Sequence, residues 1–261
     1  MILIISPGIP SHCQSRYMGE VYYESSMDKY MMEDYEATVR GFKKFLEIAP
    51  NDFNGHYLIA RSLSFLGDED GAIEYFNRAL KIKPDDYDAH IYTGILLNKK
   101  GEYDKAIMHF RHALEIIPDD GDALVHIGNV YYSQKDFDRA NEQYKKVLDR
   151  EPQHVSALRG MGNVLRKKGK SNDAVSLFRK ALVIAPDDYQ TNIEIGITLK
   201  EMGELNSAIE HFKRALTIKH DSVDAHIKLG EAFEESGDTI HASECYEKAK
   251  ELNPDWKPAL K

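Results

Sequence analysis

One stretch of the chain carries side chains of the kind that bind metal ions. His109 and His112 are three residues apart and Glu115 follows three residues later, so a helix would place all three on one face. Zinc sites normally use four ligands, and the sequence offers no fourth ligand beside these three. We therefore expect no metal site and no cofactor, and we expect these residues on a solvated helix surface.

Signatures of the common enzyme classes are missing. Gly160-Met161-Gly162 falls inside a predicted helix and does not follow a strand, so it is not a phosphate-binding loop. The sequence has no nucleophile elbow, zinc-protease helix or kinase signature. Cys13 and Cys245 fit neither a metal spacing nor a disulfide framework, and Cys245 is expected to be a small buried apolar residue. We expect a protein that is not an enzyme.

The densest positive charge in the sequence lies in one segment, which could bind a carboxylate or an acidic segment of a partner. An ordinary solvated turn would have the same composition, so both interpretations stay open. The segment contains Arg159, Asn163, Arg166, Lys167, Lys168 and Lys170.

The overall composition limits the kinds of partner. The formal net charge is -9 and the isoelectric point is about 5.7, so neither nucleic acid nor an anionic membrane surface is an expected partner. The apolar run after Met1 ends at Ser6 and is too short for a signal peptide, and no apolar run is long enough to span a bilayer. We expect a cytoplasmic protein with no membrane insertion.

A 34-residue repeat organises most of the sequence. With its recurrent proline numbered as position 32, position 8 is glycine in five of six repeats, position 20 is always alanine, and position 24 is always Phe or Tyr. Such columns predict one supersecondary unit repeated in series. The prolines that mark the period are Pro50, Pro84, Pro118, Pro152, Pro186 and, two periods further on, Pro254.

Each unit is predicted to contain two helices, because apolar residues recur at helical spacing in two segments of it. Glycine at position 15, as in Gly67, suits the left-handed residue that ends a helix. Asp86, Asp120 and Asp188 are placed to cap the helices that follow them. The mid-helix glycines at position 8 indicate a close approach between helices, with the position-20 alanines as the expected counterpart.

This pattern is similar to the tetratricopeptide repeat (TPR), and the resemblance covers about residues 19–254. It implies an all-α fold, a right-handed superhelical solenoid of stacked antiparallel helix pairs. Position 4 departs from the family's tryptophan or other large residue, and its three histidines are expected to pack and not to catalyse. Position 4 holds His56, His90, Leu124, Leu158, Asn192 and His226.

We divide the chain into a non-repeat segment, 1–18, a solenoid, 19–254, and the start of a truncated further helix, 255–261. The first repeat is expected to be an atypical cap with Tyr23 and Met27 at packing positions. Segment 1–18 is either disordered or folded back on the solenoid. The chain is either a fragment of a longer protein or one that stacks on another copy through its uncapped C-terminal end. The repeats are 19–52, 53–86, 87–120, 121–154, 155–188, 189–222 and 223–254.

The resemblance implies that the first helices line a concave groove and that their positions 2, 5, 9 and 12 point into it. Exposed apolar side chains rimmed by polar groups usually mark an interaction site, so we expect the groove to bind an extended peptide or a partner protein. The candidate peptide-binding residues are Tyr57, Arg61, Ile91, Ile95, Asn98, Val125, Asn129, Tyr132, Arg159, Asn163, Arg166, Ile193, Ile197 and Lys200.

Three functions agree with these features. The leading one is a non-catalytic interaction scaffold or adaptor with a peptide-binding groove. The alternatives are a substrate-recruiting arm of a larger enzyme, such as a glycosyltransferase, and a self-assembling structural scaffold. The complete carboxylate clamp of the chaperone-binding family members is not expected, because Glu194 and Asp224 stand where that clamp needs asparagine and lysine.

Overall fold

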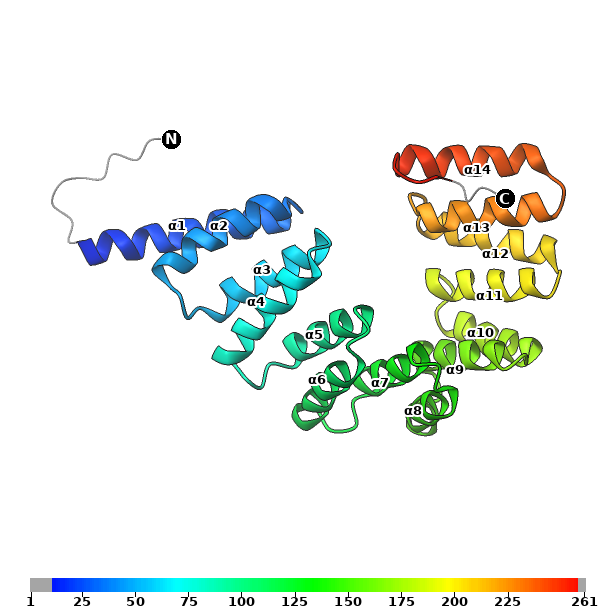
Figure 1. Ribbon diagram of the computed structural model, residues 1–261, viewed down its shortest axis with the longest axis horizontal. Helices are drawn as coiled ribbons and strands as arrows, with labels where there is room; N and C mark the ends of the chain where they lie inside the picture. Colours follow the sequence, from blue (N-terminus) through cyan, green and yellow to red (C-terminus); the bar gives the residue numbers. More distant parts are fainter. Residues whose placement is uncertain (1–10, 258–261) are drawn as a thin grey trace. The chain divides into compact units, whose positions relative to one another are not determined.

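The computed structural model of the chain describes residues 11–257, and within that range it contains α-helices and no strands. Figure 1 shows the helices joined by short turns. The first helices of the pairs are α1 (Ser11–Met31), α3 (Phe53–Phe65), α5 (Tyr87–Lys99), α7 (Gly121–Ser133), α9 (Val155–Lys167), α11 (Tyr189–Glu201) and α13 (Val223–Glu235). The second helices are α2 (Tyr35–Ile48), α4 (Glu69–Ile82), α6 (Tyr103–Ile116), α8 (Phe137–Arg150), α10 (Ser171–Ile184), α12 (Leu205–Ile218) and α14 (Thr239–Leu252).

The chain forms two compact units, residues 1–126 (unit 1) and residues 127–261 (unit 2). In unit 1 each helix from α1 to α6 packs against the next, and in unit 2 the same holds from α8 to α14. The six first helices from α3 to α13 begin on the first residue of the predicted repeats, at 34-residue intervals. The predicted all-α fold of stacked helix pairs is therefore confirmed.

The turns confirm the predicted helix ends. Gly67, Gly101, Gly169, Gly203 and Gly237 all have φ between +76° and +86°. Lys135, which replaces glycine in that column, adopts the same region with φ 61°.

The predicted aspartate caps are also confirmed. The side chain of Asp86 accepts a hydrogen bond from the backbone N–H of Ala89. Asp120 and Asp188 cap α7 and α11 in the same way, each accepting from the backbone N–H three residues later. These bonds satisfy backbone donors that the first turn of a helix leaves free.

The nearest side-chain neighbour of the position-8 glycines is the aromatic ring at position 24 of the same repeat, where the sequence predicts the alanine at position 20. A Cβ built on Gly196 would lie 2.5 Å from Cε1 of Phe212, and one on Gly94 would lie 2.6 Å from Cε1 of Phe110. Gly128, Gly162 and Gly230 meet their own position-24 rings equally closely. The glycine therefore makes room for a ring that the second helix inserts.

The three position-4 histidines each form a hydrogen bond to the backbone of the preceding repeat, which confirms their structural role. Nε2 of His56 donates to the backbone oxygen of Pro50 at 2.8 Å, and Nε2 of His90 donates to that of Pro84 at 2.9 Å. His226 bonds to the backbone oxygen of His220, which occupies the proline position, at 3.1 Å. Because a carbonyl oxygen can only accept, each of these histidines carries a proton on Nε2.

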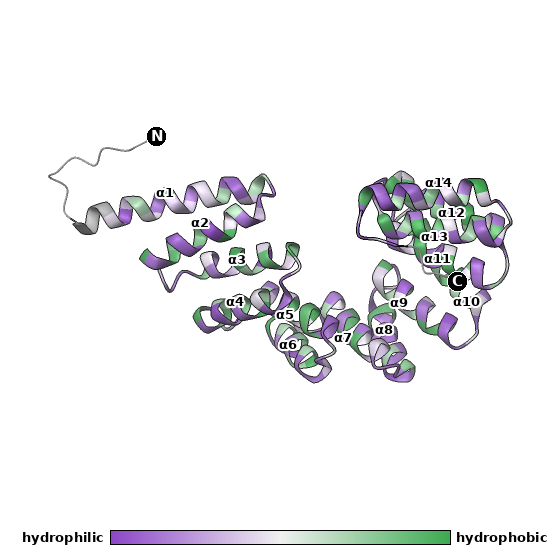
Figure 2. Cartoon of the chain, turned by 45° about the horizontal axis from the view of Figure 1, so that its top comes forward, coloured by the Kyte–Doolittle hydropathy of each residue, from purple (hydrophilic) through white to green (hydrophobic). Residues whose placement is uncertain are grey.

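Each unit has its own hydrophobic core of position-20 alanines, position-24 rings and aliphatic residues from the first helices. Figure 2 shows apolar and polar bands along the same helices, as expected for helices with one buried face. Cys245 is buried at 9% exposure, as predicted. Among residues 11–257, no helix is both long and apolar enough to cross a membrane.

The two ends of the repeat array differ from the predicted boundaries. Helix α1 begins at Ser11, eight residues before the first predicted repeat. The ring of Tyr23 contacts Phe42 and Phe45 at centroid distances of 5.5 and 5.2 Å, as its predicted packing role requires. Residues 253–257 are not helical. Residues 1–10 and 258–261, which belong to the predicted terminal segments, lie outside the described residues.

A methyl group added at position 8 should therefore destabilise a repeat. We expect Gly196→Ala to lower the free energy of unfolding by about 1–3 kcal/mol, because the Phe212 ring must move. Gly19→Ala is the matched control: its Cβ would meet Ile48 Cγ2 at 3.5 Å, an ordinary contact, and alanine favours the helix by up to about 1 kcal/mol. Urea denaturation of both variants tests this, and equal stability of the two would contradict the proposed glycine–ring packing.

Buried histidines should make the fold sensitive to acid. Burial, with smaller contributions from His90 and His112, lowers the pKa of His109 to about 4. Its Nδ1 lies 3.0 Å from Nδ1 of His90. Between pH 6.5 and 4 the unfolded chain therefore binds a proton at residue 109 that the folded chain does not, and stability that is full above pH 6.5 falls as the pH is lowered.

We expect His109→Gln to make the loss of stability between pH 7 and pH 4.5 smaller by about 1–2 kcal/mol. Urea denaturation across this pH range provides the measurement. His220→Gln, at an exposed residue, serves as the control for the loss of a histidine side chain. An unaltered pH dependence in His109→Gln would show that residue 109 is not responsible.

Candidate functional site

The first helices of successive repeats lie next to each other within each unit. Helix α1 contacts α3 in unit 1, while α9 contacts α11 and α11 contacts α13 in unit 2. Side chains at positions 5, 9 and 12 of these helices therefore share a surface, which we call the first-helix face of each unit. All fourteen candidate residues come from it.

Three candidates are buried, contrary to the expected exposure of these apolar side chains. Ile91, Val125 and Ile193 are 9%, 4% and 2% exposed. All three occupy position 5, and Ile193 belongs to the hydrophobic core of unit 2. An aliphatic side chain at position 5 turns into the packing between helices and is covered there, so these residues support the face from beneath. Ile95, at position 9, is 37% exposed and does lie on the surface.

The basic candidates of unit 2 are paired with carboxylates that lie at the start of the next first helix or on it. Arg159 Nη1 lies 2.9 Å from Asp188 Oδ2. Arg166 contacts Glu194 at 2.8 Å and Glu201 at 3.0 Å, and its side chain is only 9% exposed. The positive charge that the sequence assigns to this segment is thus largely compensated within the unit.

Lys200 continues the same arrangement one repeat later. Its Nζ lies 2.8 Å from Glu231 Oε2 and 3.1 Å from Glu235 Oε1, both on α13. Lys168 pairs with Asp138 in the same unit. Lys167 and Lys170 are exposed to solvent at the end of α9.

The amide candidates of unit 2 have their oxygens occupied. Asn129 Oδ1 accepts a hydrogen bond from the Tyr144 hydroxyl at 2.7 Å, and Asn163 Oδ1 accepts from Arg166 Nη2 at 3.4 Å. These contacts orient both amides and leave their Nδ2 groups as the donors available to a bound backbone carbonyl. Tyr132, half-buried beside Phe137, and Ile197, packed at the edge of the core, complete the candidates of this face.

In unit 1 the basic candidate has aromatic neighbours. The guanidinium of Arg61 lies 4.2 Å from the centroid of the Tyr92 ring and 5.5 Å from that of Phe65. Its Nη1 donates to the Tyr57 hydroxyl at 3.5 Å. Burial raises the pKa of Tyr57 to about 12, so this phenol stays protonated. We call these four residues the Arg61 cluster.

Two further candidates lie on α5. Ile95 is exposed, whereas Asn98 is half-buried, and its Oδ1 is buried with no hydrogen-bond partner among the described residues. The polar atom of Asn98 therefore lies beneath the exposed part of the face in unit 1. The face in this unit combines an aromatic group, one cation and an exposed aliphatic side chain.

Sequence reasoning missed two members of the Arg61 cluster, Phe65 and Tyr92. They stand at positions 13 and 6, outside the four positions that the family resemblance assigns to the groove. The available signal was an aromatic residue near an arginine. Phe65 follows Arg61 by four residues, and Tyr92 lies in the next repeat.

The histidine segment does not form a metal centre in the described part of the chain. His112 Nδ1 contacts Glu115 Oε2 at 2.9 Å on the exposed side of α6, while both ring nitrogens of His90 are engaged by Pro84 and His109. No group of three or more His, Cys, Asp or Glu side chains within residues 11–257 is arranged to hold a metal ion.

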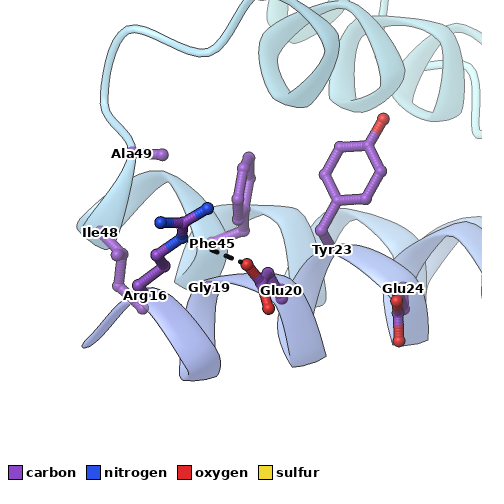
Figure 3. A pocket seen from close by; sticks show the side chains of 8 residues that line it. All are labelled: Arg16, Gly19, Glu20, Tyr23, Glu24, Phe45, Ile48 and Ala49. Carbon is purple, nitrogen blue, oxygen red and sulfur yellow. Dashed lines mark ion pairs between the residues drawn. The ribbon is translucent and has the colours of Figure 1, made fainter. Parts of the chain in front are cut away.

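A pocket of about 380 Å³ lies between α1 and α2, away from all fourteen candidates. Figure 3 shows its mainly apolar wall and the Arg16–Glu20 ion pair at its rim. The pair is exposed, with N and O 3.4 Å apart, and so adds little binding energy. The lining residues are Arg16, Gly19, Glu20, Tyr23, Glu24, Phe45, Ile48 and Ala49.

Family models of the tetratricopeptide repeat match most of the chain. One matches residues 126–189, a second matches 88–153, a third matches 54–86 and 223–255, and a TPR-repeat model matches 196–237. None of the curated proteins matches this chain.

Solved structures share the fold at low sequence identity. A tetratricopeptide repeat protein from Parabacteroides merdae is 17% identical, with 91% of this chain and 94% of that chain covered and a TM-score of 0.72. A thermophilic TPR protein from Thermus thermophilus is 23% identical, with coverages of 65% and 93% and a TM-score of 0.58. MamA from Desulfovibrio magneticus is 22% identical, with coverages of 66% and 97% and a TM-score of 0.58.

The family matches, the 34-residue helix pairs and the shared fold agree with one another. The chain belongs to the tetratricopeptide-repeat family.

Proposed function

We propose that this chain is a non-catalytic scaffold that binds an extended peptide or a segment of a partner protein on its first-helix face. Tetratricopeptide repeats generally serve protein interactions, and this family membership supports the broad assignment. The observation that carries the proposal is the exposure of Ile95 on a face that otherwise presents half-buried aromatic, amide and basic side chains. Such mixed surfaces typically bind protein segments.

The face of each unit offers a contact that an extended peptide can use. In unit 2 the Nδ2 groups of Asn129 and Asn163 can donate to backbone carbonyls, because their oxygens are already held by Tyr144 and Arg166. In unit 1 the exposed Ile95 can contact an apolar side chain of a ligand. An extended chain presents alternate side chains to one surface, which suits a face with alternating polar and apolar groups.

The paired cations of unit 2 are assigned a supporting role. Arg166 and Lys200 each reach from one first helix to carboxylates of the next one, and Arg159 reaches Asp188, the residue that caps the next first helix. Because their charge is compensated in the free protein, a ligand carboxylate would have to displace an existing partner. We therefore propose that they position neighbouring first helices and contribute little direct binding energy.

A selection from a random dodecapeptide phage library tests the proposed function. We expect binders whose affinity falls about tenfold with Ile95→Glu, since the charge disrupts an exposed apolar contact. Met108→Glu, on α6 of the same repeat and 49% exposed, is the matched control and should change affinity less than twofold. Peptides bound by unit 2 should instead lose affinity with Asn163→Ala and keep it with Val183→Glu.

Two outcomes would contradict this proposal. The library could yield no binder that survives competition with free peptide, or the binders could lose affinity equally with the first-helix variants and with the second-helix controls. Circular dichroism melts of all four variants establish that affinity changes are not caused by unfolding.

The supporting role of Arg166 leads to a separate stability prediction. We expect Arg166→Met to lower the free energy of unfolding by about 3 kcal/mol, because it leaves the nearly buried carboxylate of Glu194 unpaired. Lys228→Met removes an exposed i,i+4 pair with Asp224 and should cost about 0.5 kcal/mol or less. Urea denaturation compares the two. If both variants are equally stable, the Arg166 pairs do not hold the repeats together.

A further inference from the structure

Arg61 differs from the other cationic candidates of the first-helix faces. Arg159, Arg166 and Lys200 each form at least one ion pair with a carboxylate of the same unit. Arg61 forms no ion pair with any carboxylate among residues 11–257, and its polar contact is the Tyr57 hydroxyl. It is therefore a half-buried cation whose charge the chain itself does not neutralise.

Two aromatic rings adjoin the guanidinium of Arg61. Its central carbon lies over the Tyr92 ring at 4.2 Å from the centroid and over the Phe65 ring at 5.5 Å. The N–H groups of a guanidinium lie in its plane, so a stacked arginine can still bind both oxygens of a carboxylate. The Tyr57 hydroxyl, which accepts from Arg61 Nη1, keeps its own proton for donation to the same carboxylate.

Apolar surface adjoins this cation directly. Phe65 is 54% exposed, and its other neighbour, Tyr35, stacks on it with a centroid distance of 4.6 Å. Tyr35 comes from α2 and Tyr92 from α5, so side chains of three successive repeats surround Arg61. A ligand group bound to Arg61 thus has the exposed Phe65 ring beside it for apolar contact.

The acidic groups nearest the cluster do not compete for Arg61. Asp88 on α5 and Glu33 before α2 lie close enough to contribute to raised pKa values of Tyr57 and Tyr35, respectively, for which burial is the larger cause. Neither carboxylate pairs with Arg61. Their presence also means that a ligand carboxylate must approach closely, through direct hydrogen bonds, to gain binding energy.

We infer that the Arg61 cluster, Tyr57, Arg61, Phe65 and Tyr92, is a recognition site for a peptide carboxylate that is followed or preceded by an aromatic or large aliphatic side chain. The inference rests on the proposed peptide-binding function and names its ligand chemistry. It also moves the expected contact with an acidic partner from Arg159 and Arg166, which are already paired, to Arg61. The carboxylate comes either from an aspartate or glutamate side chain or from a C-terminus.

Three synthetic probe peptides test the site on the full chain. The acidic probe is acetyl-Ala-Asp-Phe-Asp-Phe-Ala-amide, the neutral probe has asparagine for both aspartates, and the third is the neutral sequence with a free C-terminal carboxylate. Binding is followed by NMR through the Nε–Hε signal of Arg61, which is assigned from its absence in Arg61→Lys. We expect the acidic or the C-terminal probe to bind at least about tenfold more tightly than the neutral probe, with affinity that falls as salt is added.

The variants separate charge from packing. Arg61→Gln should reduce binding of the carboxylate probe about tenfold, and Arg61→Lys should recover only part of it because lysine lacks the planar pair of donors. Arg78→Gln is the control and should leave binding unchanged, because this arginine lies over the Tyr75 ring on α4 of the same repeat and is already paired with Glu74. Thermal melts of each variant verify folding.

Equal binding of all three probes, or undiminished carboxylate binding by Arg61→Gln, would overturn the inference. A second contradicting result would come from the phage-selected peptides. These peptides would lose affinity with Ile95→Glu, would lack carboxylates near aromatic residues, and would keep their affinity with Arg61→Gln. That last outcome would leave the broader peptide-binding function intact, so the two proposals fail in distinguishable ways.

Discussion

In five repeats, a ring of the second helix is pressed against a glycine of the first. A single methyl group added to this glycine would come within about 2.6 Å of ring carbons. In these repeats the observed approach of the two helices therefore depends on the missing side chain. The ring in turn fills the pair's interior and is itself nearly fully buried, as in Phe110, Phe178 and Phe212. The placement of the first-helix faces follows from this contact.

The period, the helix boundaries and the caps could be predicted because they depend on local chemistry repeated at fixed positions. Gly67 needs a left-handed backbone wherever its neighbours lie, and Asp86 caps the helix that follows it in sequence. The partner of the position-8 glycines could not be predicted with the same certainty, since a column of small residues does not say which other column it meets. Alanine and a ring were both possible, and the structure selects the ring.

The candidate site was less predictable, because exposure and pairing depend on the neighbouring repeat. The repeat pattern predicts exposure for the aliphatic residues at position 5. Ile193 is nevertheless buried in the core of unit 2, which contains residues of several repeats and cannot be predicted from a single one. Likewise Arg166 meets Glu201 across 35 residues of sequence, a distance over which charge patterns carry little information. In unit 2, Arg166 and Lys200 join successive repeats, whereas Arg61 in unit 1 lies over two aromatic rings.

The ion pairs of unit 2 give its repeats a fixed order. Arg166 on α9 pairs with Glu194 and Glu201 on α11, and Lys200 on α11 pairs with Glu231 and Glu235 on α13, so in these pairs the cation belongs to the earlier first helix. If the repeats 155–188 and 189–222 exchanged places, Lys200 would face Asn163 and Lys167 where it now meets Glu231 and Glu235. The repeats share one fold but are not interchangeable. Exchanging these two repeats would lower stability, because the charges of neighbouring first helices would no longer match.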